Sequence, residues 1–231
     1  MSDVSVLAPL AEGRHAAISA RFASIGTAQL ADAATETIEV LDLPLRRHTA
    51  ATHICGPLFP VQTSNDMLPC LQALAAAPVG WVLFIANEVH PSEGLVGDIF
   101  CLAAETQGLA GVVVDGAARD LGELASIGLP VFSTEVNYVS ARTTTQRLDT
   151  VPATIRVGGA TLSPGIWLFG DRDGFLTVPA SEVDAILIAG EVLRERELRL
   201  KRELEAGRRL DEVTGLADFL SGITPSLRYA P

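Results

Sequence analysis

Three ionisable side chains stand where this sequence could do chemistry. Asp98 comes directly after Gly97, and Arg119 and Asp120 follow an apolar run; in both places a predicted strand gives way to a predicted helix. Free N–H groups and the positive end of a helix favour an anion there. An arginine can bind a carboxylate through two parallel hydrogen bonds, and aspartate oxygens suit Mg²⁺ or Mn²⁺. The pattern predicts a pocket for an anion and a divalent metal.

Each of these residues also has a purely structural interpretation. Asp98 and Asp120 are residue types that cap helices, and Asp115-Gly116 is a common turn pair. Arg119 could pair with a surface carboxylate and contribute little. Taken singly, each residue is more simply explained by structure than by catalysis. Only their combination favours a functional site.

Other kinds of active site have little support in the sequence. Lys201 is the only lysine and lies in a charged C-terminal segment, so a Schiff-base mechanism is disfavoured. No glycine-rich phosphate-binding motif and no GxSxG serine motif is present. The histidines lack the spacing of metal ligands; they are His15, His48, His53 and His90. Of the classes of active site considered, a metal-assisted reaction on a small anion is the one that the sequence supports.

The elements that must position these residues alternate between strand and helix. Continuous apolar runs predict buried strands, and stretches of about ten residues between them predict helices. The strands are predicted at 81–85, 111–114 and 130–132, and the helices at 97–107 and 117–127. This alternation is typical of parallel β-α-β units with both faces covered, which bind ligands at the carboxyl ends of their strands.

The flanking segments complete a predicted α/β fold with a central mixed sheet, flanking helices and a long C-terminal helix. A broken helix at 9–34 precedes a strand at 54–61 and a helix at 64–77. Shorter strands are predicted at 153–157, 166–170 and 175–178, with a tight turn at 170–174. A long helix from Ser181 to about Ala206 follows. We expect one domain over residues 1–231, with a helical extension at about 180–231.

The composition narrows the range of partners. The 231 residues carry a formal net charge of −11, which argues against binding to a nucleic-acid backbone. No apolar run reaches the roughly 20 residues needed to span a bilayer, and no export signal is evident. The three cysteines, Cys55, Cys70 and Cys101, offer no disulfide framework or metal-binding motif. A cytoplasmic protein is expected.

The segment GDIFCLAAETQGLAGVVVDGAARD has twenty residues between Asp98 and the pair Arg119-Asp120. This spacing closely resembles the D-x20-R-D signature of the RraA-like family. That family includes 4-hydroxy-4-methyl-2-oxoglutarate / 4-carboxy-4-hydroxy-2-oxoadipate aldolases, which also decarboxylate oxaloacetate, and the regulator of ribonuclease E activity A. Further resemblances cover most of the chain, at residues 28–33, 64–66 and 170–175 with Pro179.

The resemblance implies a mechanism and a set of roles. Asp120 would hold Mg²⁺ or Mn²⁺, Arg119 would bind the pyruvyl carboxylate and enolate, and Asp98 would orient water or Arg119. The backbone amides of Gly97, Asp98, Ile99 and Phe100 would contact the pyruvyl group. The implied activity is that of a class II aldolase, which cleaves a 4-hydroxy-2-oxo dicarboxylic acid to pyruvate and a second oxo acid. Oxaloacetate decarboxylase activity is implied as well.

The resemblance also implies an assembly, a homotrimer or homohexamer with active sites between subunits. Acidic residues of a neighbouring subunit would hold metal-bound water; by position they would be Asp32 and a helical glutamate, Glu197 or Glu195. Two departures from the family pattern are present. Pro164-Gly165 is followed by Ile166 instead of an acidic residue, and the stretch Glu88–Glu93 does not align. We expect that loop to border the pocket and to influence substrate choice.

Two other functions remain open on the sequence. The chain could be a non-catalytic regulator that binds an RNA-degrading enzyme, because the same fold serves that role in relatives. It could also be a lyase of the same fold that acts on a different 2-oxo acid. The retention of Asp98, Arg119 and Asp120 favours catalysis.

Overall fold

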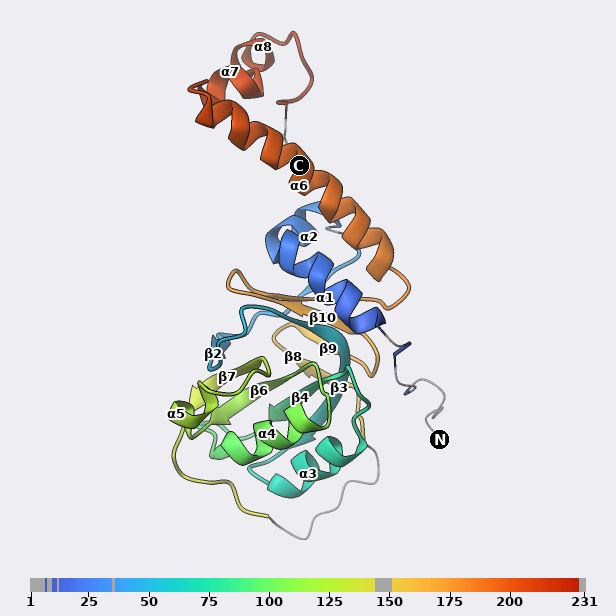
Figure 1. Ribbon diagram of the computed structural model, residues 1–231, viewed down its shortest axis with the longest axis vertical. Helices are drawn as coiled ribbons and strands as arrows, with labels where there is room; N and C mark the ends of the chain where they lie inside the picture. Colours follow the sequence, from blue (N-terminus) through green and yellow to red (C-terminus); the bar gives the residue numbers. More distant parts are fainter. Residues whose placement is uncertain (1–6, 8–9, 12, 35, 144–150, 229–231) are drawn as a thin grey trace.

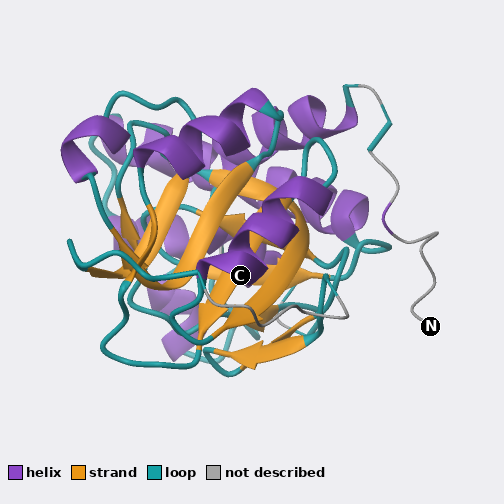
Figure 2. Cartoon of the chain, turned by 90° about the horizontal axis from the view of Figure 1, so that it is seen from below, coloured by secondary structure: helices purple, strands orange, loops and turns teal. Residues whose placement is uncertain are grey.

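The molecule is built on a nine-stranded mixed sheet, which lies among the helices in Figures 1 and 2. The computed structural model describes residues 7, 10–11, 13–34, 36–143 and 151–228, so the predicted helix start at Pro9 lies outside the described residues. The strand order is β1-β11-β10-β3-β4-β6-β7-β2, and β5 also pairs with β6. The strands are β1 (Glu39–Val40), β2 (Arg46–Arg47), β3 (Ile54–Thr63), β4 (Val82–Asn87), β5 (Gly94–Val96), β6 (Gly111–Ala118), β7 (Val131–Val136), β10 (Trp167–Gly170) and β11 (Phe175–Val178). The predicted α/β fold with a central mixed sheet is confirmed.

The parallel part of the sheet brings the candidate residues to one edge. Strands β3, β4, β6 and β7 run parallel, and apart from Val136 at the end of β7 their apolar residues are buried on both faces, as in parallel sheets generally. The short β5 is parallel to the end of β6, with Gly94 opposite Ala117 and Val96 opposite Ala118. The residues that follow the two strands therefore start side by side.

Two helices cover this part of the sheet from the outside. Helix α3 (Met67–Ala76) begins after Asp66, whose carboxylate accepts a hydrogen bond from the Leu68 amide at 2.9 Å. Helix α4 (Asp98–Thr106) starts after Gly97 and ends before Gly108, which has a φ of 77°. Both helices pack with β3, β4 and β6 in one core cluster.

The opposite face of the parallel strands is covered by other strands, because the sheet curls. Phe132 on β7 meets Phe175 on β11 with ring centroids 5.0 Å apart, although these strands lie far apart in the strand order. A small hairpin, β8 (Ile155–Val157) and β9 (Ala160–Leu162), helps to fill the enclosed core, to which no described helix contributes a buried residue. Strands thus cover this face, and the helices that flank the sheet pack elsewhere on it.

A second group of helices packs on β10 and β11. Helices α1 (Arg14–Ile25) and α2 (Thr27–Ala33) are separated by Gly26, whose φ of 91° breaks the helix as predicted. They share a core cluster with the start of α6 (Val183–Glu205). Figure 1 shows that α6 continues away from the sheet and leads to α7 (Leu210–Thr214) and α8 (Leu216–Leu220).

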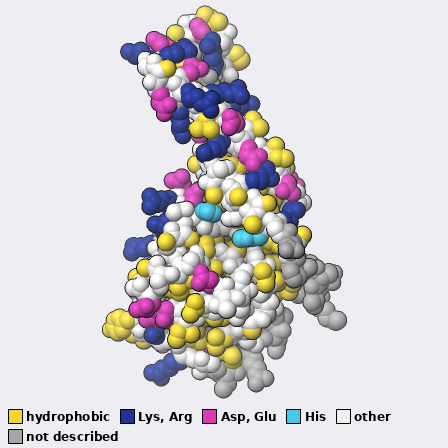
Figure 3. All heavy atoms as spheres, viewed as in Figure 1, with side chains coloured by type: hydrophobic (Ala, Val, Ile, Leu, Met, Phe, Trp, Pro, Cys, Tyr) yellow, Lys and Arg dark blue, Asp and Glu magenta, His cyan; other side chains and the backbone are white. Residues whose placement is uncertain are grey.

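The distal part of α6 has the polar surface expected of a solvated helix. In Figure 3, basic and acidic side chains alternate along it, with apolar side chains among them. The long C-terminal helix is confirmed, whereas the assignment of residues 1–231 to a single domain stays a prediction. Among the described helices, none has the length and apolar character needed to cross a membrane.

Two local predictions are wrong. The predicted helix at 117–127 is shorter, because β6 continues to Ala118 and only Leu121–Leu124 are helical, as α5. Ala117 and Ala118 are fully buried and pair with strands on both sides, which outweighs their helix propensity. The long C-terminal helix begins at Val183 with Glu182 at its N-cap and no capping side chain, so Ser181 does not cap it.

Candidate active site

A pocket of about 330 Å³ lies where β5 and β6 end. It brings together all six residues singled out near the two strand ends: Gly97, Asp98, Ile99, Phe100, Arg119 and Asp120. Helices α3 and α4 form much of its wall. The location follows from the β5–β6 pairing, which sets the start of α4 beside the residues after β6. The catalytic roles of these residues stay predictions.

The first turn of α4 presents backbone donors at this pocket. The first hydrogen bond of the helix runs from the Cys101 amide to the Gly97 carbonyl oxygen, at 3.0 Å. The amides of Asp98, Ile99 and Phe100 therefore have no acceptor within the helix. Free amides at a helix start bind carboxylates and enolate oxygens.

Arg119 and Asp120 form an ion pair at the edge of the pocket. The Arg119 Nε–H donates to Asp120 Oδ2 at 2.9 Å, and the Arg119 amide donates to the Val96 carbonyl at 2.9 Å. Both side chains are about one-third exposed. Among the described residues, no group accepts a hydrogen bond from the terminal nitrogens of Arg119. The Asp120 bond thus orients the guanidinium and leaves its outer edge for a ligand.

Gly97 is required by the close approach of this ion pair. A Cβ atom at Gly97 would lie 2.4 Å from Asp120 Oδ2 and 3.2 Å from Arg119 Cγ. Gly97 itself has an extended backbone, with a φ of −144°, so its role here is space and not an unusual conformation.

Gly97→Ala should displace the Asp120 carboxylate and weaken any reaction in this pocket. We expect kcat/KM to fall on the order of 100-fold, because a misplacement of about 1 Å costs this much when a site depends on alignment. Circular dichroism and thermal melting should show a folded protein. The matched control is Gly122→Ala, because a Cβ at Gly122 meets no atom within 4 Å. Equal activity of the two variants would show that the Gly97 contact is unimportant.

The donor set fits a divalent ion in part. Asp98 and Asp120 contribute carboxylates, which are the ligands that Mg²⁺ and Mn²⁺ prefer. Within the described residues, no group of three His, Cys, Asp or Glu side chains is arranged as a metal site. Mg²⁺ commonly keeps several waters and binds through one or two carboxylates together with the substrate. Asp120 can serve such an ion.

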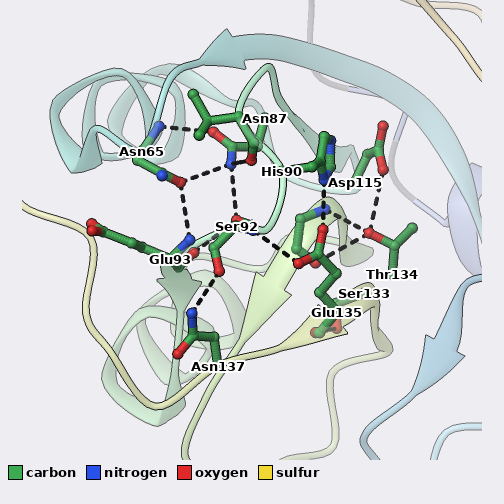
Figure 4. Close-up of polar contacts among 12 residues, drawn as sticks. Asn65, Asn87, His90, Ser92, Glu93, Asp115, Ser133, Thr134, Glu135 and Asn137 are labelled. Atoms are coloured by element: carbon green, nitrogen blue, oxygen red, sulfur yellow. Dashed lines mark hydrogen bonds and ion pairs between the residues drawn. The ribbon is translucent and has the colours of Figure 1, made fainter.

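The loop Glu88–Glu93 is not itself part of the pocket lining, which begins at the next residue, Gly94. Asparagine side chains hold the loop, as Figure 4 shows. The Asn87 amide nitrogen donates to Asn65 Oδ1 at 2.8 Å and to Ser92 Oγ at 2.9 Å. Asn137 donates to the Ser92 carbonyl at 2.8 Å. These bonds fasten the chain immediately before β5, the strand that leads to Gly97 and Asp98.

A histidine–carboxylate pair lies in the same network and was missed by the sequence analysis. His90 pairs with Glu135 through Nδ1, and Glu135 also accepts the Ser92 amide at 2.8 Å. Asp115 lies close by and bonds Thr134 Oγ1 at 3.3 Å; burial raises the pKa of Asp115. A sequence signal for this pairing is absent, because β7 and the loop are 45 residues apart.

The His90–Glu135 pair predicts a small dependence of stability on pH. The hydrogen bond to Glu135 raises the pKa of His90 above 6.5. The stability that protonated His90 contributes is complete below pH 6.5 and is lost as the pH rises through the raised pKa. Burial alone would raise the pKa of Glu135, but hydrogen bonds from His90 and the Ser92 amide lower it below 4.5 overall. The stability that Glu135 contributes is therefore present above pH 4.5 and is lost as the pH falls through this lowered pKa.

We expect Glu135→Gln to remove stability mainly between about pH 5 and 6.5, by less than about 1 kcal/mol because both groups are partly exposed. Urea unfolding at pH 5.5 and 8 measures the difference between wild type and variant. His48 and His53 titrate in both proteins, so the difference between variant and wild type reports on the His90–Glu135 pair and on the Asp115 carboxyl beside it. A difference that stays constant with pH would contradict the assignment.

The residues assigned to a neighbouring subunit do not reach the pocket within one chain. Asp32 on α2 is exposed, as is Glu195 on α6. Glu197 accepts a hydrogen bond from Gln29 Nε2 at 2.8 Å. Figure 1 places α2 and α6 at the end of the molecule away from α3 and α4. These three residues can join a site of this kind only from another copy.

The fold and the pocket define an α/β protein with an arginine–aspartate site at the carboxyl edge of its parallel strands. The family model described as RraA-like (Aldolase/RraA) matches residues 27–177. The chain belongs to the RraA-like family.

Two relatives of this chain are named as putative aldolases. A protein of Halalkalibacterium halodurans named "Putative 4-hydroxy-4-methyl-2-oxoglutarate aldolase" is 30% identical over 135 residues, which are 58% of this chain and 63% of that protein. A protein of Alkalilimnicola ehrlichii with the same name is 28% identical over 162 residues, 70% of this chain and 99% of that protein. The chain thus spans less than two thirds of the first of these relatives.

One solved structure with a similar fold has a name that indicates a different function. The RNA-processing inhibitor RraA from Thermus thermophilis has a TM-score of 0.62 and 25% identity to this chain. The likeness covers 67% of this chain and 92% of that structure. The family therefore includes both aldolase names and a regulator.

Proposed function

We propose that this protein is a divalent-metal-dependent lyase that cleaves a carbon–carbon bond in a 4-hydroxy-2-oxo acid and releases pyruvate. The observation that carries the proposal is the pocket that joins Arg119, Asp120 and the free amides at the start of α4. These groups suit an anion whose charge grows during the reaction. The aldolase names of the relatives support the same class of reaction.

The reaction is a retro-aldol cleavage. The C4 hydroxyl loses its proton to a water that Asp98 orients, and the C3–C4 bond breaks. The oxygen forms a carbonyl at C4, while the electron pair of the broken bond moves to C3 and the 2-oxo group as an enolate. Arg119 binds the carboxylate and, with the α4 amides, stabilises the enolate. Protonation at C3 then gives pyruvate. Oxaloacetate would give the same enolate by loss of CO₂.

The metal in this proposal is Mg²⁺ or Mn²⁺, held by Asp120. Bound beside Arg119, a divalent ion supplies positive charge that polarises the 2-oxo group. We also propose a homotrimer or homohexamer in which Asp32 and Glu197 or Glu195 of a neighbouring copy would help to hold the metal site. Their position on α2 and α6, away from their own pocket, agrees with that arrangement.

Pyruvate release, coupled to lactate dehydrogenase, tests the proposal. The substrates are oxaloacetate, 4-hydroxy-4-methyl-2-oxoglutarate and 4-hydroxy-2-oxopentanoate, each with Mg²⁺, Mn²⁺ or EDTA. Because oxaloacetate decarboxylates with metal alone, enzyme-free reactions are required. We expect release above this background that EDTA abolishes. If none of the three substrates releases pyruvate above the background, the proposal is overturned.

A regulator of RNA processing is the second candidate, favoured by the likeness to the Thermus RraA. Inhibition of a purified RNA-degrading endonuclease, measured by cleavage of a labelled RNA, tests it. Inhibition that is unchanged in an inactive Arg119 variant would indicate a binding role independent of the pocket.

A further inference from the structure

The side chain of Arg119 lies against strand β5, and a glycine at each end of this strand makes room for it. A Cβ atom at Gly94 would lie 3.1 Å from Arg119 Cδ, and a Cβ atom at Gly97 would lie 3.2 Å from Arg119 Cγ. The Arg119 amide also donates to the Val96 carbonyl at 2.9 Å. The position of the guanidinium therefore depends on the position of β5.

Strand β5 has three residues and is held on both of its edges. One edge pairs with β6, which leads directly to Arg119. On the other edge, the Gly94 amide donates to the Val139 carbonyl at 2.7 Å, and the Ala141 amide donates to the Gly94 carbonyl at 3.0 Å. Ser140, which lies between these two partners, lines the pocket. The chain from Val139 to Ala141 thus supports the outer edge of β5.

Asn137 connects this outer support to the rest of the site. Its side-chain amide donates at 2.8 Å to the carbonyl of Ser92, two residues before β5, and Figure 4 shows the side chain pointing toward Ser92. Its Oδ1 accepts the Val139 amide at 2.9 Å. Its backbone amide donates at 3.1 Å to the carbonyl of Ala118, the residue before Arg119. One residue thus joins the chain before β5, the end of β6 and the outer support of β5.

The carboxamide of asparagine suits these contacts because it carries a donor and an acceptor. The Ser92 carbonyl needs a donor and the Val139 amide needs an acceptor, and one planar group supplies both. The two partners also determine which end of the carboxamide faces which segment. Asn137 is not among the described residues that line the pocket. Its side chain therefore acts on Arg119 through the segments that it holds.

We infer that Asn137 is a positioning residue, which sets the Arg119 guanidinium by holding β5 and its outer support in place. The inference rests on the proposed function and deepens it, because Arg119 is the group that binds the carboxylate and the enolate there. A misplacement of about 1 Å in such a group costs on the order of 100-fold in rate. A purely structural role, in which Asn137 only closes the turn after β7, would have no effect specific to Arg119.

A double-mutant cycle between Asn137 and Arg119 tests the inference. We expect Asn137→Ala to lower kcat/KM at least about tenfold for the hydroxy acid that is cleaved fastest, because the guanidinium is no longer aligned. In an Arg119→Lys background, the same change should cost less than about twofold, because the group that Asn137 positions has already been replaced. Equal losses in the two backgrounds would show that Asn137 acts independently of Arg119 and would overturn the inference.

Two further variants complete the cycle. Ser126→Ala is the matched control, because it removes a side chain–backbone hydrogen bond of 2.7 Å at an exposed position outside the pocket lining. We expect it to leave kcat/KM unchanged, and a loss equal to that of Asn137→Ala would contradict the inference. Asn137→Ser keeps an acceptor for the Val139 amide and loses the donor to Ser92, so its activity should lie between those of wild type and Asn137→Ala. It takes the place of Asn137→Ala in the cycle if circular dichroism shows that the alanine variant is unfolded.

Binding of pyruvate separates this inference from the proposed function. Titration calorimetry with Mg²⁺ should show at least about tenfold weaker binding of pyruvate to Asn137→Ala and to Arg119→Lys than to wild type. This pattern without turnover of any hydroxy acid would overturn the lyase function and leave the role of Asn137 standing. Pyruvate release by wild type, with unchanged binding and activity in Asn137→Ala, would do the reverse. A wild-type protein that neither binds nor releases pyruvate would overturn both.

Discussion

Arg119→Lys should lower kcat/KM for pyruvate release by about 100-fold to 1000-fold while the protein stays folded. Lysine keeps the positive charge, but its ammonium cannot bind Asp120 and a substrate carboxylate with the planar geometry of a guanidinium. Loss of one aligned donor to a developing oxyanion costs this much in other enzymes. Because Arg119 is one-third exposed, the change should have little effect on stability.

The measurement is the coupled pyruvate assay together with a thermal melt. Arg156→Lys is the matched control, because Arg156 is exposed on β8 and does not line the pocket. Activity of Arg119→Lys equal to that control would remove Arg119 from the mechanism.

Asp120→Ala should abolish metal-dependent activity, with a loss of at least about 1000-fold. The variant lacks the proposed metal ligand and the acceptor that orients Arg119. Asp120 has a φ of 57°, so alanine also disturbs the backbone there. Asparagine tolerates this conformation better, and Asp120→Asn therefore isolates the loss of charge.

Titration of Mn²⁺ by calorimetry or electron paramagnetic resonance gives a readout that does not depend on turnover. We expect Asp120→Asn to weaken binding markedly and Asp173→Asn, an exposed residue of the β10–β11 turn, to leave it unchanged. Equal metal affinity of wild type and Asp120→Asn would show that the ligand assignment is wrong.

Much of the site was predictable because local signals and topology agree at the two strand ends. Continuous apolar runs at 81–85 and 111–114 predict parallel strands, and parallel strands end at a common edge. That rule predicts one shared edge for the segments after these strands, whereas the short β5, which was not predicted, sets Asp98 beside Arg119. The helix α4 was likewise predictable, because its observed bounds, 98–106, lie within the predicted range of 97–107.

Other features depend on contacts that local patterns do not encode. The strand β6 continues through Ala117 and Ala118 because β5 and β7 pair with it there, although alanine favours helices. The curl of the sheet, which brings Phe132 to Phe175, depends on the whole strand order. The same is true of the His90–Glu135 pair, which joins a loop to a strand.

By itself, the sequence determined the reactive groups: an arginine and two aspartates at a spacing shared with a known family, and a strand–helix order that brings them to one edge. The tertiary structure alone decided what surrounds them. It set the apolar face of α3 opposite α4 and kept Glu88–Glu93 out of the pocket. It also held α2 and α6 away from the pocket. The reason is physical, because residue type and local spacing determine strands and helices, whereas burial of apolar surface between distant segments determines which of them meet.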